Sequence, residues 1–380
     1  MSEVVALGQP TVGEEELAAV AEVFASGWLA GNGPTSRKFE ADFAQVAGTE
    51  FALAVSNCTA ALHLAFLGLG LGPGDEVIVA DYTFPATGHA VMFTGATPVF
   101  ADVRPDIWTV DPAAVAAAIT PRTVGIVGVD VVGQPADYDE LRELADRHGL
   151  WLVEDAAAAS GATYRGRPAG SLADAACFSF HGRKGITSGE GGALTTNRPE
   201  LDAFARKAHA FGIESALNRA ASADLPVPRF DELGYNYKLS DIAAAILRVQ
   251  LTRLPELIKA RQTVADGYQQ RLADLDLVSL PVTGADRGHV WQSYLLTLDP
   301  SVGRAAVAAQ LRRSGVQCNF GTYASHLQPL YVTTYGTPEP CPVSADVFRR
   351  HLAIPMHANL TSDELDRVCV ALRAALSTTG

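Results

Sequence analysis

Short apolar segments alternate with helical patterns through the first half of the chain, and this alternation is the strongest constraint on the fold. Helical patterns lie between several of them, for example over residues 60–67 and over 139–148, where Asp137 and Glu140 are expected to cap the helix. The apolar segments are residues 51–55, 76–80, 98–101, 125–129, 151–154 and 177–180. This alternation predicts an α/β fold with a mostly parallel central sheet and helices on both faces. Ligands of such sheets bind outside the carboxyl ends of the strands.

Two amphipathic helices are expected before this alternating region. Thr11 and Glu14 predict a capping box for the first helix, and Gly27 is expected to stop it. The second helix is followed by Gly48. The expected apolar faces of the two helices carry Leu17, Val20 and Phe24, and Phe39, Phe43 and Val46.

The pattern changes after about residue 240 and predicts a smaller α+β domain. Its expected elements are helices over 240–254 and 257–272, a strand over 291–298, a helix over 304–314 and a last helix capped by Thr361 and Glu364. We therefore expect a large ligand-binding α/β domain over residues 1–250, with the N-terminal helices, and a small α+β domain over 251–380. The polar, proline-containing segment 215–233 is expected to be a long loop.

The composition argues against several classes of function. The formal net charge of -13 disfavours non-specific binding to nucleic acid and docking on anionic lipid. No run of 18 or more apolar residues is present, so we expect no membrane span, and the N-terminus lacks a signal-peptide pattern. The five cysteines are odd in number and form no CxxC pair. We expect free thiols in a reducing cytoplasm, and no metal site.

The segment 177–197 holds the most informative residue, Lys184. A predicted strand carries Ser179 to its end, the lysine follows five residues later, and a turn containing Gly189 leads into the next strand. A lysine beside a strand end and a glycine-rich turn suits a residue that forms a Schiff base with a ligand aldehyde. The alternative is a solvated surface lysine in a loop.

A carboxylate stands at the end of another predicted strand. Asp155 follows the segment 151–154, where it can pair with a pyridinium nitrogen and keep that nitrogen protonated. The alternative is an aspartate that caps a helix. The neighbouring Glu154 is expected to point to the other face, because side chains alternate along a strand.

Two further segments follow strands. The backbone N–H groups of Cys58, Thr59 and Ala60 open a helix and can bind an anion, although an ordinary helix cap by Asn57 or Thr59 is the alternative. Phe84 can lie flat against an aromatic ring, and a core aromatic is its alternative. A cofactor with an aldehyde, a basic ring nitrogen, a flat face and a phosphate would use all four segments.

The sequence resembles the DegT/DnrJ/EryC1/StrS family of sugar aminotransferases, nearly from end to end. The matching motifs are SGW at 26–28, SNCTAALHLA at 56–65, GPGDEVIVADYTF at 72–84, VEDAAAASGATYRGRPAGS at 153–171, FSFHGRKGITSGEGGALTTN at 178–197, GYNYKLSDIAAA at 234–245, HLQP at 326–329 and AIP at 353–355. The resemblance implies a fold type I (aspartate aminotransferase-like) homodimer that uses pyridoxal 5'-phosphate (PLP).

The resemblance also implies roles for individual residues. Lys184 would bind the cofactor covalently, Asp155 would face its ring nitrogen and Phe84 would lie on its ring. Thr59, Ala60 and Ser179, with Cys58 beside them, would hold its phosphate. Asn236 would reach the phosphate in the neighbouring subunit, so each site would need the dimer.

The substrates follow from the same resemblance. Family members typically take nitrogen from glutamate or glutamine and place it on a nucleotide-linked keto sugar, and the SGEGG turn is similar to members that act on 4-keto-6-deoxy sugars. A keto-cyclitol as acceptor, a PLP-dependent sugar dehydratase or other lyase, and a regulator without turnover remain alternatives. Family dehydratases carry histidine in place of the lysine, so Lys184 favours the aminotransferase.

The chain departs from the family pattern in the expected acceptor region. Ala158 stands where the family usually has a glutamine that contacts the phenolic oxygen of the cofactor. Tyr323, after Thr322, stands where a His-Tyr pair is common, and Lys238 stands where many members have arginine. We expect Tyr323, Lys238 and His326 to contact the substrate, with a structural histidine as the alternative for His326.

Overall fold

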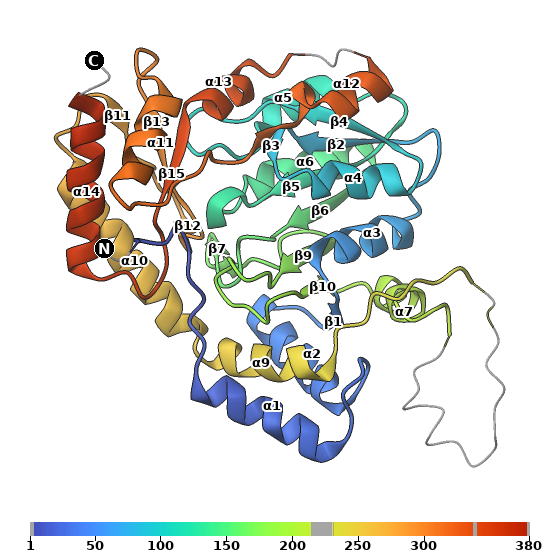
Figure 1. The fold of residues 1–380 in the computed structure, drawn as a ribbon. Helices are drawn as coiled ribbons and strands as arrows, with labels where there is room; N and C mark the ends of the chain where they lie inside the picture. The colour runs from blue at the N-terminus through green and yellow to red at the C-terminus, as the bar shows by residue number, and fades with distance from the viewer. Residues whose placement is uncertain (1–3, 214–229, 231, 337–339, 378–380) are drawn as a thin grey trace.

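The computed structural model describes residues 4–213, 230, 232–336 and 340–377, and its centre is a seven-stranded sheet (Figure 1). In spatial order the strands are β1 (Phe51–Val55), β10 (Gly192–Thr196), β9 (Ala175–Ser179), β6 (Trp151–Asp155), β5 (Thr123–Val129), β2 (Glu76–Ala80) and β4 (Thr97–Ala101). Strand β10 runs antiparallel to β1 and β9, and the other neighbouring pairs are parallel. The expected mostly parallel sheet is confirmed.

Helices cover both faces of this sheet, because its strands carry buried side chains on both sides. On one face α3 packs on β9 and β10, with α4 and α7 beside it, and on the other α2 and α9 bury Phe39 and Phe43 against Phe178. The bounds are α2 (Pro34–Ala47), α3 (Cys58–Gly68), α4 (Ala86–Phe93), α5 (Pro112–Ala118), α6 (Tyr138–His148), α7 (Pro199–Ala208) and α9 (Asp241–Thr252).

A second, three-stranded antiparallel sheet lies beside the first (Figure 1). It consists of β11 (Val278–Ser279), β13 (Tyr294–Leu298) and β15 (His351–Ile354), and it is covered by α10 (Leu254–Leu272), α11 (Arg304–Arg313) and α14 (Ser362–Ser377). A separate core cluster lies here, and Val5 from the N-terminal segment joins it. The domain division at residue 250 stays a prediction.

Short elements connect and border these two sheets. They are α1 (Glu14–Ser26), β3 (Tyr82–Thr83), η1 (Val131–Gly133), β7 (Thr163–Tyr164), β8 (Arg167–Pro168), β12 (Arg287–Gly288), β14 (Tyr323–Ala324), η2 (Ser325–Leu327), α12 (Pro329–Tyr335) and α13 (Pro342–Arg350). Strand β14 pairs with β3 and so joins the C-terminal region to the edge of the cavity. In the part of the chain that the structure describes, no helix has both the length and the apolar composition to cross a membrane.

The first helix is capped differently from the prediction. Gly13 is the N-cap of α1, and its N–H donates to the Glu16 carboxylate at 2.7 Å, so the capping box predicted from Thr11 and Glu14 is wrong. Glu16 is buried because Gln250 also donates to its carboxylate. The predicted apolar face instead points outward, since Leu17 is 70% exposed.

At α6 the predicted cap position is confirmed, because Asp137 is the N-cap, but its side chain makes no hydrogen bond to the helix. Its carboxylate pairs with Arg104 and Arg287, and these charged partners compete successfully for it. The capping box of Thr361 and Glu364 is confirmed, with 2.9 and 3.3 Å bonds in the two directions. Most of the loop predicted over 215–233 lies outside the described residues.

Candidate active site

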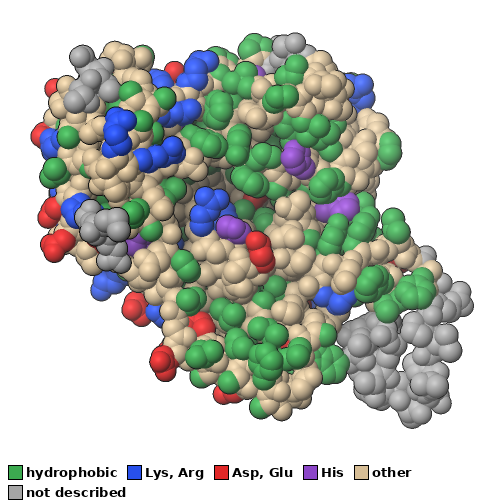
Figure 2. All heavy atoms as spheres, in the orientation of Figure 1, with side chains coloured by type: hydrophobic (Ala, Val, Ile, Leu, Met, Phe, Trp, Pro, Cys, Tyr) green, Lys and Arg blue, Asp and Glu red, His purple; other side chains and the backbone are tan. Residues whose placement is uncertain are grey.

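A cavity of about 370 Å³ opens at the carboxyl ends of the parallel strands, and Figure 2 shows a hollow at the centre of this face. Such a volume suits a cofactor with a small substrate. One side of the cavity is formed by the ends of β5, β6 and β9, the start of α3 and Phe84. The segments 292–295, 319–322 and 353–356 close the other side. The site is therefore placed where the strand pattern predicts it.

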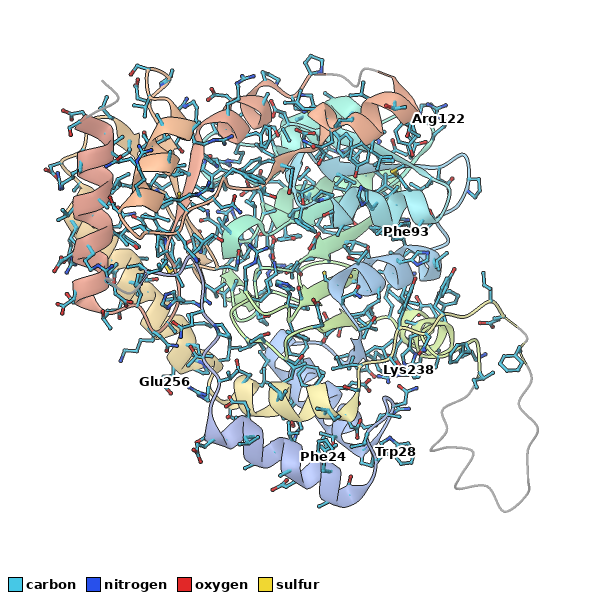
Figure 3. All side chains as sticks on the ribbon, viewed as in Figure 1. Phe24, Trp28, Phe93, Arg122, Lys238 and Glu256 are labelled. Carbon is cyan, nitrogen blue, oxygen red and sulfur yellow. The ribbon has the colours of Figure 1, made fainter. Side chains whose placement is uncertain are left out.

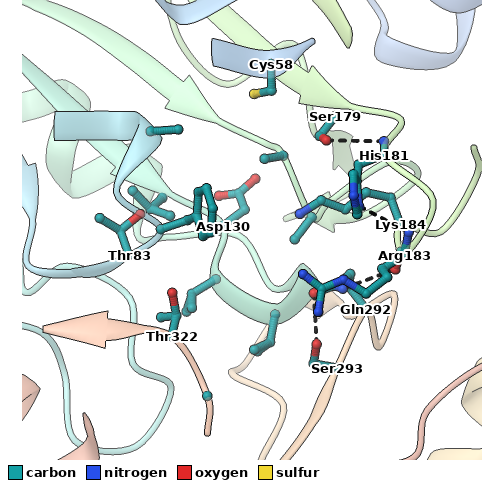
Figure 4. Close-up of a pocket in the computed structure, with 18 of the residues that line it drawn as sticks. Cys58, Thr83, Asp130, Ser179, His181, Arg183, Lys184, Gln292, Ser293 and Thr322 are labelled. Atoms are coloured by element: carbon teal, nitrogen blue, oxygen red, sulfur yellow. Dashed lines mark hydrogen bonds between the residues drawn. The ribbon is translucent and has the colours of Figure 1, made fainter. Parts of the chain in front are cut away.

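Lys184 extends into this cavity from the turn after β9 (Figure 4). Its backbone N–H donates to the carbonyl of His181 at 2.8 Å, and His181 pairs with Gly189 across the turn. Burial lowers the pKa of the Lys184 amine below its ordinary value, and the charge of Arg183 acts in the same direction. A lysine with a lowered pKa holds more of its neutral, nucleophilic form near neutral pH.

Asp155 is the last residue of β6, and it lines the same cavity with only 5% of its surface exposed. Thr87 donates from its hydroxyl to Oδ2 at 2.7 Å, and the N–H of Ala157 donates to Oδ1 at 3.2 Å. Burial raises the pKa of the Asp155 carboxyl, while these two hydrogen bonds and the charge of Lys184 oppose the rise. Thr87 carries no signal for this role in the sequence, because the helix that brings it to Asp155 is far away along the chain.

The start of α3 and the end of β9 meet at one corner of the cavity, and their role in binding an anion stays a prediction. Cys58, Thr59 and Ser179 line the cavity there. The Asn57 side chain accepts a 2.9 Å hydrogen bond from the N–H of Ala60, so that donor is already used in a helix cap. The alternative of an Asn57 cap is therefore correct, and it coexists with the cavity.

A glycine makes this corner possible. A Cβ on Gly192 would lie 2.5 Å from the carbonyl carbon of Asn57 and 2.7 Å from the nitrogen of Cys58. Strand β10 can therefore pass beside the start of α3 only without a side chain at this position. Close packing against Asn57 and Cys58 therefore explains the glycine at position 192.

The predicted aromatic position is open to the cavity. Phe84 lines it and is 62% exposed, and its ring meets the ring of Tyr323 edge-on at 6.1 Å between centroids. Thr322 also lines the cavity, and Tyr323 lies just behind. The two rings therefore border the open side of the site.

His326 is not brought into the cavity. It is buried, its ring nitrogen Nδ1 is hydrogen-bonded to the Asp81 carboxylate at 2.7 Å, and its backbone N–H donates to the same carboxylate at 2.6 Å. Asp81, His326 and Cys341 place possible metal ligands within 4.8 Å of one another. The Asp81 carboxylate also accepts from the Ser344 hydroxyl, so hydrogen bonds within the protein satisfy this cluster.

Asn236 and Lys238 lie outside the cavity of their own chain. The Lys238 amine donates to the Asn236 side chain and stands 4.3 Å above the ring of Phe211. Figure 3 places Lys238 near Trp28, at the outer side of the molecule. Neither residue contacts the Lys184 site within one subunit.

Several lining residues were not singled out in the sequence. The end of β5 and η1 contributes Asp130, the lysine turn contributes Arg183, and the C-terminal region contributes Gln292 and Asn319. Asp130 had a usable signal, because it directly follows a predicted strand. Arg183 stands next to the predicted lysine, whereas Gln292 and Asn319 lie in segments that only the fold brings here.

The residues present fit PLP on the chemistry of their groups. The cavity holds a lysine amine, a buried carboxylate that a hydroxyl and an N–H orient, and a helix start with a serine beside it. These are the partners that the aldehyde, the ring nitrogen and the phosphate of PLP require. With the seven-stranded sheet, they define a fold type I PLP enzyme.

Comparison with known proteins agrees with this class. The profile of the DegT/DnrJ/EryC1/StrS aminotransferase family matches residues 10–373. The spore coat polysaccharide biosynthesis protein SpsC of Bacillus subtilis (strain 168) is 36% identical over 370 residues, which cover 96% of this chain and 95% of that protein. The chain therefore belongs to the DegT/DnrJ/EryC1/StrS aminotransferase family.

Solved structures give the same result. The aminotransferase TlmJ from Streptoalloteichus hindustanus superposes with a TM-score of 0.92 at 35% identity, over 99% of this chain and 100% of that chain. The PLP-form of Spr1654 from Streptococcus pneumoniae superposes with a TM-score of 0.92 at 25% identity, again over 99% and 100%. The protein is a PLP-dependent aminotransferase, and the predicted fold type is confirmed.

Proposed function

We propose that the protein transfers an amino group from glutamate or glutamine to a nucleotide-linked keto sugar, of the 4-keto-6-deoxy type. The observation that carries the proposal is the meeting of the Lys184 amine and the Asp155 carboxylate in one cavity at the strand ends. The similarity to SpsC, whose name assigns it to polysaccharide biosynthesis, supports a saccharide acceptor. The SGEGG turn supports the 4-keto-6-deoxy class.

The side chains divide the chemistry between them. PLP, when bound, supplies an aldehyde for the amine of the substrate and an electron-withdrawing ring. The Lys184 amine would hold the cofactor through its aldehyde, and once free it would take the proton from the α-carbon of the donor and return it to the carbon of the cofactor that had carried the aldehyde. Asp155 holds a proton at the ring nitrogen, and Thr87 keeps its carboxylate in place. The same residues act in reverse order on the acceptor.

The acceptor has room on the side of the cavity that the C-terminal region lines. Polar groups of Gln292, Ser293, Asn319 and Thr322 stand there, and these suit the hydroxyl groups of a sugar. Ala158 also lines the cavity, and its small side chain leaves space beside the phenolic oxygen of PLP. Tyr323 borders this region, whereas His326 would reach an acceptor only through a change in its hydrogen bonds to Asp81.

The active unit that we propose is a homodimer with shared sites. Asn236, with Lys238 beside it, lies away from its own cavity but would reach the phosphate in the partner subunit. An apolar side chain is exposed on the same side, where Phe24 is 60% exposed. Figure 3 shows Phe24, Trp28 and Lys238 grouped there. Burying such a surface against a second copy would remove an unfavourable exposure.

The half-reaction with the donor tests the function. The purified protein should absorb as a yellow PLP enzyme and lose that band with L-glutamate or L-glutamine. Lys184→Ala should abolish both the spectral change and turnover, whereas Lys259→Ala, at an exposed position of α10, should change neither. Sustained transamination by Lys184→Ala would refute the role of the lysine.

The acceptor assay distinguishes the proposal from its alternatives. A keto sugar nucleotide should be converted to an amino sugar with one 2-oxoglutarate formed for each glutamate. Conversion of a keto-cyclitol alone would move the acceptor to that class. Consumption of a sugar without 2-oxoglutarate would identify a dehydratase and reject amino transfer.

Mixing two inactive variants tests the shared site. Lys184→Ala lacks the catalytic amine, and Asn236→Ala lacks the residue given to the partner. If the subunits exchange, a mixed dimer contains one intact site, so activity should recover after co-refolding. Absence of recovery in dimers that have demonstrably exchanged subunits would contradict the role of Asn236.

A further inference from the structure

Arg183 is a cation that lines the cavity while its side chain stays open to solvent. Its guanidinium makes no hydrogen bond or ion pair to any residue that the structure describes, although its side chain lines the cavity. Arg104, Arg142 and Arg206, by contrast, each bind carboxylates. An unpaired guanidinium inside a substrate cavity is available to an anionic group of the ligand.

Two hydrogen bonds hold the backbone of Arg183 at the edge of the cavity. The N–H of Arg183 donates to Nδ1 of His181 at 3.3 Å, and its carbonyl accepts from the Gln292 side chain at 3.3 Å. Figure 4 shows Arg183 and Lys184 extending into the same space from neighbouring positions. The charge of Arg183 lowers the pKa of the Lys184 amine, so the two groups also interact electrostatically.

We propose that Arg183 binds the α-carboxylate of the amino donor, an inference that rests on the proposed function. The donor nitrogen must replace the Lys184 nitrogen at the same aldehyde carbon. Its α-carboxylate is attached to the carbon next to that nitrogen, so it must lie near the position of Lys184. Arg183 is the neighbouring residue, and its planar guanidinium can bind a carboxylate through two parallel hydrogen bonds.

The negative charges around the site disfavour an anionic substrate unless a positive group binds it. The chain carries a net charge of -13, and Asp155 and Glu190 also line the cavity. A free amino acid carboxylate would be repelled without a local positive group. The phosphate of PLP would use the start of α3 and Ser179, which leaves Arg183 for the substrate.

The phosphates of the acceptor are a less suitable ligand for Arg183 than the donor carboxylate. A nucleotide-linked sugar also carries anionic phosphates, but the sugar ring separates them from the reacting carbonyl carbon. Its phosphates therefore lie farther from Lys184 than the α-carboxylate of a donor does. The donor carboxylate is the anion whose position the reaction itself fixes beside Arg183.

L-glutamate and 4-aminobutyrate provide a matched pair of probes, because they differ only in the α-carboxylate. Titration of the PLP absorbance gives an apparent dissociation constant for each. Arg183→Gln should weaken L-glutamate by roughly 10- to 100-fold, the contribution of one charged, two-point hydrogen-bonded contact. The value for 4-aminobutyrate should change by less than about 3-fold, and Arg183→Lys should fall between wild type and Arg183→Gln.

Arg349→Gln is the matched control, since Arg349 is exposed on α13, away from the cavity. It should bind both probes as the wild type does. Glutarate gives a readout that needs no turnover: it should raise the melting temperature of the wild type and of Arg349→Gln but not of Arg183→Gln. Circular dichroism and retained PLP confirm that the variants are folded.

The outcomes separate this proposal from the function on which it rests. Unchanged binding of L-glutamate by Arg183→Gln, or an equal loss for both probes, would overturn the carboxylate contact. So would a defect confined to the acceptor KM, which would assign Arg183 to the acceptor. A wild-type protein that no amino acid bleaches would instead reject the proposed function, whatever the variants do.

Discussion

Replacing Asp130 with asparagine should make the protein more stable at neutral and alkaline pH, because Asp130 forms a buried carboxyl pair with Glu154. Both side chains are fully buried, and they lie close enough for the Asp130 charge to raise the pKa of the Glu154 carboxyl. Oδ1 of Asp130 accepts from the Tyr138 hydroxyl at 2.8 Å, whereas no N–H or hydroxyl among the described residues donates to Oδ2. Two such carboxyl groups can share a hydrogen bond only if one of them keeps its proton.

The size of the effect follows from where that proton is released. Burial raises the pKa of Asp130 from its ordinary 3.8 to about 7, and burial with the Asp130 charge raises the pKa of Glu154 well above its usual range. Between about pH 4 and 7 the Asp130 carboxyl of the folded protein thus keeps a proton that the unfolded chain has released, and the Glu154 carboxyl keeps a second one to higher pH. The Asp130 proton by itself makes the free energy of unfolding fall as pH rises, by ~1.4 kcal/mol per pH unit and roughly 4 kcal/mol in total.

The amide introduced by Asp130→Asn would replace the shared proton by a permanent N–H donor to Glu154, so this loss should disappear. The melting temperatures of Asp130→Asn and wild type should be similar at pH 5 and diverge with rising pH. At about 2 °C per kcal/mol for a chain of this size, the gap should reach roughly 6 °C at pH 8. Thermal melting of the PLP-loaded proteins at several pH values measures it.

Two further variants sharpen this experiment. Glu154→Gln places the donor on the other partner and should remove the same pH dependence, but at a constant cost in stability, because the N–H groups of Gly170 and Leu172 donate to the Glu154 carboxylate. Asp276→Asn, at an exposed position, should follow the wild type at every pH. Parallel melting curves for wild type, Asp130→Asn and Glu154→Gln across this pH range would refute the shared proton.

Three substitutions around the cofactor cavity have separate expected outcomes. Thr87→Val removes the hydroxyl that donates to Asp155, so PLP retention in equilibrium dialysis should weaken about 10-fold, whereas Thr87→Ser should retain it; equal retention by both would contradict the argument. Gly192→Ala places a Cβ 2.5 Å from the carbonyl carbon of Asn57, so unfolding should cost ~1–3 kcal/mol less in urea, and an unchanged midpoint would show that β10 can shift freely. Ala158→Gln should raise the acceptor KM while the half-reaction with glutamate stays unchanged; slowing of the half-reaction alone would argue that position 158 does not border the acceptor.

The local pattern of the sequence was sufficient for the large elements and for the centre of the site. Strands β1 and β2 have the predicted bounds, and the other predicted strands of the central sheet differ by at most two residues at either end. Lys184 and Asp155 lie at the cavity because each follows a strand, and parallel strands bring their carboxyl ends together. Strand ends are encoded in neighbouring residues, so a single sequence can indicate them.

The partners of these residues required the tertiary structure. Thr87 meets Asp155, and Asp130 meets Glu154, across strands and helices that are distant in sequence. The tertiary structure also decides that Asn236 lies away from the cavity of its own subunit.

The sequence also does not show which of several possible hydrogen-bond partners a side chain binds. The Asp137 carboxylate binds two arginines instead of accepting a hydrogen bond from its helix. His326 binds Asp81 instead of facing the cavity. The sequence alone determined which chemical groups stand at the strand ends. Only the folded chain decided which of them meet, because side-chain contacts depend on distances in space and not on spacing along the chain.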